Sequence, residues 1–200
     1  NEAAILSCGV ATPFHGLRAR AKVKPGDNVL IMGVGGLGIH AVQVARLCGA
    51  RVIAVDIVEE HLTMAKEYGA DEVLAFDQST FVSKILDLTG TGATVIFETV
   101  GLPSTIEESL RALEPGGKLV MAGYYPGKPF AGETPLIVLK ELEIMGTRAM
   151  NKQELIELVS LTADGRITPV VTGSFGLEEV NSIMQQLSRG KITGRVVVTP

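Results

Sequence analysis

The sequence has few aromatic residues, few cysteines and no long apolar segment. Aromatic residues make up 4% of the 200 residues, and tryptophan is absent. The two cysteines, Cys8 and Cys48, provide neither a CxxC metal motif nor a disulfide framework, which favours a reducing compartment. Charges or glycines interrupt every apolar stretch before the roughly 18 residues that a spanning helix needs. The sequence therefore predicts a cytoplasmic protein without a membrane helix.

The charges are mixed, and their sum is small. Lys and Arg number 18 against 22 Asp and Glu, which gives a formal net charge of -4. Because no long basic run is present, we expect neither nucleic acid nor an anionic membrane as a partner. The 46% of hydrophobic residues suffices for the core of one domain of about 100–200 residues. The start, Asn1-Glu2-Ala3-Ala4, has neither an initiating Met nor a signal peptide, so we interpret the chain as a fragment of a longer protein.

Short apolar runs alternate with helical patterns along most of the chain. A run at Val29–Met32 is followed by a glycine cluster and by helical spacing up to Leu47, and a β-branched run follows at Arg51–Asp56. Further expected elements are a helix to Tyr68, a strand near 73–75, helices over 80–88 and 104–113, and strands over 94–97, 118–122 and 143–146. Continuously apolar strands indicate a parallel sheet with helices on both faces. We therefore expect an α/β fold with a Rossmann-type doubly wound parallel sheet of about six strands.

The pattern changes after Gly146. Helices over 152–163 and 177–187 and a last strand over 195–198 are expected to form a short returning C-terminal segment. Residues 124–135 contain three Pro and two Gly and are expected to form a long loop near the carboxyl edge of the sheet, where ligands of such folds bind. The alternative is a disordered connector.

A glycine motif carries the first evidence of function. The segment Gly33-Val34-Gly35-Gly36-Leu37-Gly38 fits G-x-G-x-x-G and lies between an expected strand and an expected helix. Gly33 permits a tight turn, Gly35 lets the backbone approach a pyrophosphate, and Gly38 lets helix and strand pack closely. Asp56 ends the next strand 18 residues after Gly38, near the spacing of about 20 expected for the acid that binds the ribose hydroxyls. The alternative is a glycine turn that binds nothing, with Asp56 as a helix cap.

The residues around Asp56 favour NAD over NADP. Its carboxylate would repel a 2′-phosphate, and the next four residues, Ile57-Val58-Glu59-Glu60, include no Arg or Lys to bind one. A methyltransferase would use a similar loop, but its usual acid two positions before the first glycine is replaced by Ile31.

Taken together, these motifs resemble the zinc-type alcohol dehydrogenases of the medium-chain dehydrogenase/reductase family over nearly the whole chain. The segments that carry the resemblance are ILSCGVAT at 5–12, VKPGD at 23–27, GVGGLG at 33–38, GARVIAVD at 49–56, YGAD at 68–71, LEPGGK at 113–118, EIMGTR at 143–148 and GKITGRVV at 190–197. In this family a GroES-like catalytic domain precedes this region, and no part of these 200 residues resembles it. The resemblance thus implies a connecting segment at 1–22, an NAD-binding Rossmann domain at 23–147, and C-terminal helices and a strand at 148–200 that return toward the catalytic domain.

The resemblance also implies the roles of individual residues. Cys8 would be the third protein ligand of the catalytic zinc, Thr12 would lie beside the nicotinamide ring where the catalytic step takes place, and Leu37 would pack behind that ring. The remaining implied coenzyme contacts are the backbones of Ala122, Tyr124 and Met145 at the carboxamide, Arg195 at the pyrophosphate, and His61, Thr99 and Val100.

Several of these residues have alternative interpretations. Cys8 on its own chemistry would be a buried thiol. His61 replaces a lysine of many relatives and could be an exposed helical histidine, and Arg195 could be solvated. His15 and His40 have no His, Cys or acid at metal spacing, so we interpret them as packing or surface residues, and Cys48 as a core residue.

The resemblance implies an NAD-dependent, zinc-dependent alcohol or polyol dehydrogenase as the parent protein, acting on a small alcohol or carbonyl compound as a homodimer or homotetramer. The fragment alone would bind coenzyme without turnover. Two alternatives stay open: a zinc-free NAD(P)H quinone or enoyl reductase of the same family, and a non-catalytic module that senses NAD.

Overall fold

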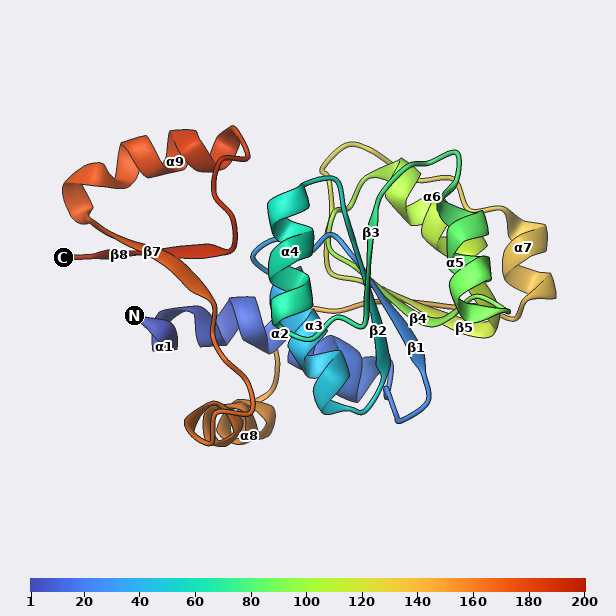
Figure 1. Cartoon of the computed structure of the whole chain (residues 1–200), viewed down its shortest axis with the longest axis horizontal. Helices are drawn as coiled ribbons and strands as arrows, with labels where there is room; N and C mark the ends of the chain where they lie inside the picture. The colour runs from blue at the N-terminus through green and yellow to red at the C-terminus, as the bar shows by residue number, and fades with distance from the viewer.

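A computed structural model describes all residues from 1 to 200, and it confirms the expected Rossmann-type sheet (Figure 1). Six strands pair in parallel in the order β3-β2-β1-β4-β5-β6. Their bounds are β1 (Asn28–Met32), β2 (Arg51–Asp56), β3 (Glu72–Ala75), β4 (Ala93–Glu98), β5 (Leu113–Met121) and β6 (Glu143–Gly146). The chain order reverses between β1 and β4, so the carboxyl ends of these two strands mark the crevice where ligands of doubly wound folds bind.

Helices cover both faces of the sheet, because alternate side chains of each strand point to opposite sides. On β1, Val29 and Ile31 belong to one apolar core, whereas Leu30 and Met32 belong to the other. The first core is covered by α3 (Gly38–Leu47) and α4 (Glu59–Glu67), and the second by α5 (Phe81–Thr89) and α6 (Pro103–Ala112) (Figure 1). All four of these helices are among those that the sequence pattern predicts.

Residues 2–20 are helical, a feature that was not predicted from the sequence. Two α-helical and two π-helical segments follow one another as α1 (Glu2–Ile5), η1 (Leu6–Val10), α2 (Ala11–Phe14) and η2 (His15–Arg20). Phe14 and Leu17 are fully buried in the same core as α3. This expected connecting segment is therefore an integral layer of the domain.

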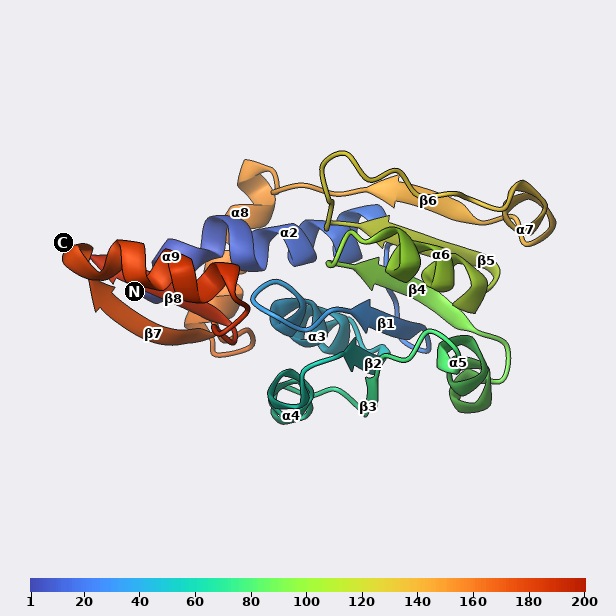
Figure 2. The ribbon, with the colours of Figure 1, turned by 90° about the horizontal axis from the view of Figure 1, so that it is seen from above.

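The C-terminal region forms a small separate unit. After α8 (Lys152–Ala163), the strand β7 (Val171–Gly176) pairs in parallel with β8 (Arg195–Thr199), and η3 (Leu177–Glu179) and α9 (Val180–Ser188) connect them. Figure 2 shows this unit at the same end of the molecule as the N-terminus, where the Asn1 side chain donates to Ser174 Oγ at 3.1 Å. The strand β7 was missed because VTGSFG contains two glycines and no apolar run.

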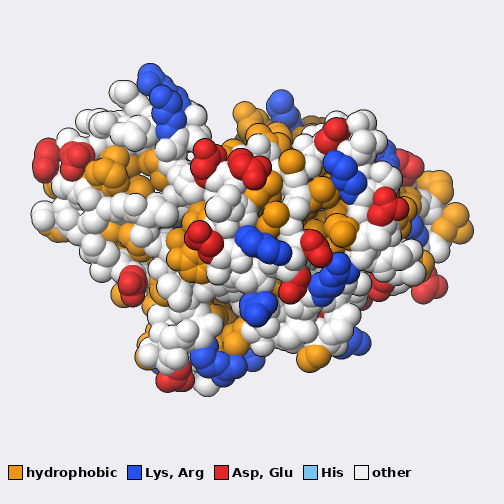
Figure 3. Space-filling model, in the orientation of Figure 1, with side chains coloured by type: hydrophobic (Ala, Val, Ile, Leu, Met, Phe, Trp, Pro, Cys, Tyr) orange, Lys and Arg blue, Asp and Glu red, His pale blue; other side chains and the backbone are white.

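The expected long loop follows β5 and ends two residues earlier than predicted, because α7 (Thr134–Leu139) begins within it. Val138 and Leu139 on α7 are 69% and 82% exposed, and hydrophobic side chains gather over this helix at the right edge of Figure 3. No helix of the structure combines the length and the apolar character needed to cross a membrane.

Candidate coenzyme-binding site

The glycine motif forms the connection from β1 to α3. Gly33 has a φ of +85°, a conformation that favours glycine. A Cβ on Gly38 would lie 1.9 Å from the carbonyl oxygen of Gly33, so only glycine lets α3 approach the strand this closely. Two glycines of the motif are therefore required by backbone geometry alone.

The same loop exposes free hydrogen-bond donors. The amides of Gly35, Gly36 and Leu37 donate to no protein acceptor, and they lie at the positive N-terminal end of α3. A Cβ on Gly35 would meet only the His61 ring, at 3.9 Å, so the space beside this residue is open. The loop is thus suited to bind a pyrophosphate.

Asp56 lies at the end of β2, next to the glycine loop. Its Oδ2 accepts the Val34 amide at 2.7 Å, and its Oδ1 accepts the amides of Ile57 and Val58 at 2.8 and 3.0 Å. These bonds fix the carboxylate at the edge of an apolar cavity of about 230 Å³ that is also lined by Gly33 and Val100. The position and the charge suit a ribose diol bound between the two elements.

His61 on α4 stands beside this carboxylate. Its Nδ1 lies 3.2 Å from Asp56 Oδ2, and the side chain is 14% exposed. Nδ1 is buried and makes no hydrogen bond of good geometry. The alternative of an exposed helical histidine is therefore wrong, whereas a contact with the coenzyme stays a prediction.

A second cavity, of about 470 Å³, lies on the other side of the glycine loop. It brings together six residues that the sequence analysis assigned to the site: Cys8, Thr12, Leu37, Ala122, Tyr124 and Arg195. They come from the N-terminal helix, the loop before α3, the segment after β5 and the start of β8. Segments far apart in sequence thus meet at one end of the sheet.

Met145 lies outside this cavity, although the resemblance implied a coenzyme contact for it. The cavity is lined instead by the next residues along the chain, Gly146, Thr147 and Arg148. These three residues could have been predicted as site residues, because they lie at the carboxyl end of β6, where ligands of parallel sheets bind.

Hydrogen bonds hold several of these residues in place. The Thr12 hydroxyl accepts the Ala149 amide at 3.3 Å. Arg195 Nε donates to the Gly36 carbonyl at 3.0 Å. Arg195 is therefore bound to the glycine loop, which contradicts the alternative of a merely solvated arginine.

Two further predicted residues lie where β1 and β4 separate. The Thr99 hydroxyl is within 3.0 and 2.9 Å of the Met32 and Gly33 carbonyls, to which it donates, and Val100 lines the cavity beside Asp56. Thr99 thus bonds the backbone at the start of the glycine loop, and only Val100 lines the cavity that a ligand could occupy.

Glu98, which was not predicted as a site residue, is fully buried at the end of β4. Its carboxylate accepts the amides of Val100 and Gly101 and the Thr105 hydroxyl. Burial raises the pKa of Glu98, and these hydrogen bonds oppose that shift. The sequence feature that could have indicated Glu98 is its position as an acid at the end of an otherwise apolar strand. Its role is to fix the turn after β4, which lines the cavity beside Asp56.

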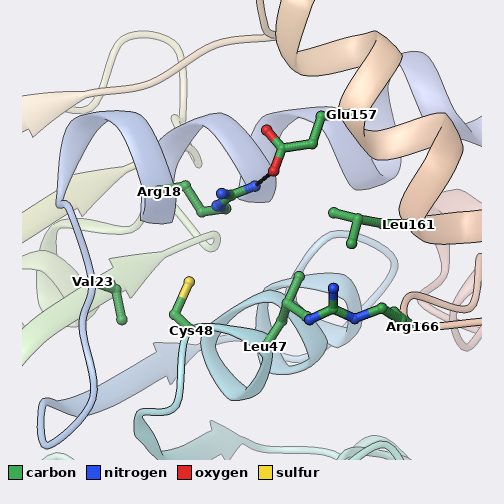
Figure 4. Close-up of a pocket in the computed structure, with 7 residues that line it drawn as sticks. All are labelled: Arg18, Val23, Leu47, Cys48, Glu157, Leu161 and Arg166. Atoms are coloured by element: carbon green, nitrogen blue, oxygen red, sulfur yellow. Dashed lines mark hydrogen bonds and ion pairs between the residues drawn. The ribbon is translucent and has the colours of Figure 1, made fainter.

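His15 and Cys48 line neither of the two cavities at the glycine loop, and both side chains are partly buried. His15 Nδ1 lies 2.9 Å from Glu154. Cys48 lines a separate cavity of about 250 Å³ beneath the pair formed by Arg18 and Glu157 (Figure 4). Burial raises the pKa of the Cys48 thiol, which keeps it protonated and unreactive.

The residues of this chain do not form a complete metal site. Cys8 is exposed rather than buried, so it is available as a ligand. No group of three or more His, Cys, Asp or Glu side chains is placed to hold a metal ion. Zinc sites need three or four protein ligands, so the chain by itself does not supply a full set.

The fold and the two cavities at the glycine loop define a dinucleotide-binding domain. A family model described as zinc-binding dehydrogenase matches residues 36–164. The chain belongs to this family, within the medium-chain dehydrogenases/reductases, as the sequence resemblance predicted.

Relatives with two different names match the chain. It is 34% identical over 202 residues to an NAD-dependent alcohol dehydrogenase of Sulfurisphaera tokodaii, with 100% of this chain and 58% of the relative covered. It is also 34% identical to an acryloyl-coenzyme A reductase of Metallosphaera sedula, with 98% and 58% covered. The crystal structure of an alcohol dehydrogenase from Aeropyrum pernix superposes with a TM-score of 0.90 at 33% identity, with 100% and 58% covered. The chain thus spans little more than half the length of the relatives that it matches.

Proposed function

We propose that the chain is the NAD(H)-binding part of an oxidoreductase that transfers hydride between a small alcohol and NAD. The observation that carries the proposal is the Asp56 carboxylate, held by three amides beside a loop with free amides. In this arrangement the loop would bind the pyrophosphate and Asp56 the ribose. Thr12 and Leu37 would flank the nicotinamide ring, which supplies the hydride-accepting carbon.

The first prediction is that the chain binds NADH at least tenfold more tightly than NADPH. A tenfold ratio needs only about 1.4 kcal/mol, and Asp56 with the exposed Glu59 and Glu60 would repel a 2′-phosphate. Fluorescence titration of both coenzymes measures the ratio. Asp56→Asn should bring the ratio closer to one, whereas Glu60→Gln, the matched control, should change it less. Equal affinities for the unmodified chain would contradict the proposal.

A second candidate function is reduction of an enoyl thioester, because relatives at 32% and 34% identity bear the name acryloyl-coenzyme A reductase. The longer protein discriminates between the two. Oxidation of a primary or secondary alcohol with NAD supports the first function, and reduction of acryloyl-coenzyme A supports the second. Coenzyme binding without either reaction would support a sensing module.

We further propose that Cys8 provides one zinc ligand in the longer protein. Its thiol is exposed and lines the same cavity as Thr12 and Arg195. A thiolate is a much better zinc ligand than a hydroxyl, so the second prediction is that Cys8→Ser lowers the zinc content of the longer protein and leaves NADH affinity nearly unchanged.

Elemental analysis measures the zinc content per chain. Cys48→Ser is the matched control, because Cys48 lies in the separate cavity of Figure 4, and it should keep the zinc content of the unmodified protein. Full zinc occupancy in Cys8→Ser would show that this thiol is not a ligand.

A further inference from the structure

His40 connects two parts of the chain that the coenzyme site needs together. It lies on the first turn of α3 and is fully buried. Its Nδ1 donates to the Gly36 carbonyl at 3.1 Å, and its Nε2 accepts the Val170 amide at 2.9 Å. The ring therefore connects the glycine loop to Val170, the residue that leads into β7. His40 and Val170 are 130 positions apart in the sequence.

The Gly36 carbonyl receives a second donor, Arg195 Nε, at 3.0 Å. Arg195 starts β8, and β8 pairs with β7. The C-terminal unit thus reaches Gly36 by two routes, through His40 from β7 and through Arg195 from β8. A Cβ on Gly36 would lie 2.5 Å from the Gly194 carbonyl oxygen, which shows how closely the two parts approach.

The orientation of this carbonyl decides where the next amide points. In a trans peptide the C=O of Gly36 and the N–H of Leu37 point in opposite directions. Two donors that hold the carbonyl on the side of the C-terminal unit therefore turn the free Leu37 amide to the opposite side. That amide is one of the three unpaired donors of the loop.

We propose that His40 is a positioning residue, which aims the Leu37 amide at the coenzyme pyrophosphate and couples the loop to the C-terminal unit. The proposal rests on the proposed NAD binding. The function needs a neutral ring, because protonation of Nε2 would place a donor against the Val170 amide. Burial lowers the pKa of His40 to about 4, and Arg195 is the charged group that faces the ring, so His40 is neutral near pH 7.

The third prediction compares His40→Ala, His40→Gln and Gln43→Ala in the 200-residue chain. The glutamine amide has an NH2 group that can donate and a carbonyl oxygen that can accept, so His40→Gln can keep both bonds and should bind NADH nearly as the unmodified chain does. His40→Ala should weaken NADH binding about tenfold, the effect of one or two lost hydrogen bonds. Gln43 lies one turn further along α3 and bonds Thr168 at 2.9 and 2.8 Å without contact to the loop, so Gln43→Ala is the matched control.

Hydrogen exchange without coenzyme provides an independent measurement. His40→Ala should speed exchange in residues 33–38 and in β7 together, and Gln43→Ala should speed it near Thr168 only. Unchanged exchange in the loop, or equal NADH affinities for His40→Ala and Gln43→Ala, would overturn the proposal. If the unmodified chain binds no NADH, the proposed function fails, and the exchange pattern alone decides whether His40 couples the two parts.

Discussion

At the scale of single residues, His40 makes the stability of the domain depend on pH. An unfolded imidazole binds a proton near pH 6.5, and the buried ring binds one only near pH 4. Between these values the unfolded state holds more protons, so the free energy of unfolding should fall as the pH drops from 6.5 to 4. The fourth prediction is a loss of up to about 3 kcal/mol from this residue.

Urea unfolding of the unmodified chain and of His40→Gln across this range measures the effect. The difference between the two proteins isolates His40, because both contain Glu98. Burial raises the pKa of Glu98, so its contribution to stability changes with pH in the opposite direction. Folding favours the protonated form of Glu98, which adds stability at low pH that is lost as the pH rises. Parallel pH profiles for the two proteins would contradict the prediction.

Spacing alone could predict only residues whose partners are close in sequence. Residues with distant partners were either assigned through the family resemblance, as Arg195 was, or not predicted. The glycine loop and Asp56 are separated by one helix, and their spacing alone predicts that they meet. His40 was interpreted as a packing or surface residue, because the Val170 amide that it accepts comes near it only in the folded chain. Glu98 was missed for a different reason: an acid at a strand end is ordinarily solvated, and its burial follows from the turn that folds over it.

At the scale of elements, the edge strand β6 remains unpaired on one side. It pairs only with β5, and the exposed Val138 and Leu139 of α7 precede it. An open edge with uncovered apolar side chains favours pairing with a second copy. We therefore propose that two chains associate edge to edge through β6 about a two-fold axis.

The fifth prediction is that the isolated chain dimerises at tens of micromolar and that Ile144→Lys dissociates the dimer. Ile144 lies within β6, and a lysine there would bring like charges close across the two-fold axis. Light scattering gives the mass of each. Ile156→Lys, an exposed position on α8, is the control and should stay dimeric. A monomer mass for the unmodified chain would refute association through this strand.

The six strands of the main sheet could be predicted because strands of a parallel sheet are buried on both faces and therefore contain short apolar runs. β7 could not, since VTGSFG in this two-stranded surface sheet contains two glycines and no apolar run. The N-terminal helical layer was also missed, because the resemblance suggested a connector there. Its burial depends on α3 and α8, which contribute the apolar surface that it covers.

At the scale of the whole molecule, the two ends of the candidate site differ in how much of the chain they need. The cavity proposed for the adenosine half of the coenzyme is lined by the glycine loop, Asp56 and residues that follow β4. The cavity proposed for the nicotinamide half is lined by the N-terminal helix, the segments after β5 and β6, and Arg195 at the start of β8. The second cavity therefore exists only when nearly all of the chain is folded.

The strand order has a consequence for the order in which this chain can fold. β1, β2 and β3 pair only among themselves until β4 joins β1, so residues 28–75 can form their part of the sheet through local contacts before the later strands arrive. Local contacts form faster than distant ones. During synthesis, the glycine loop and Asp56 would therefore meet before residue 93 is made. A partly made chain would thus hold the glycine loop next to Asp56 long before Val100, Val170 and Arg195 complete the site.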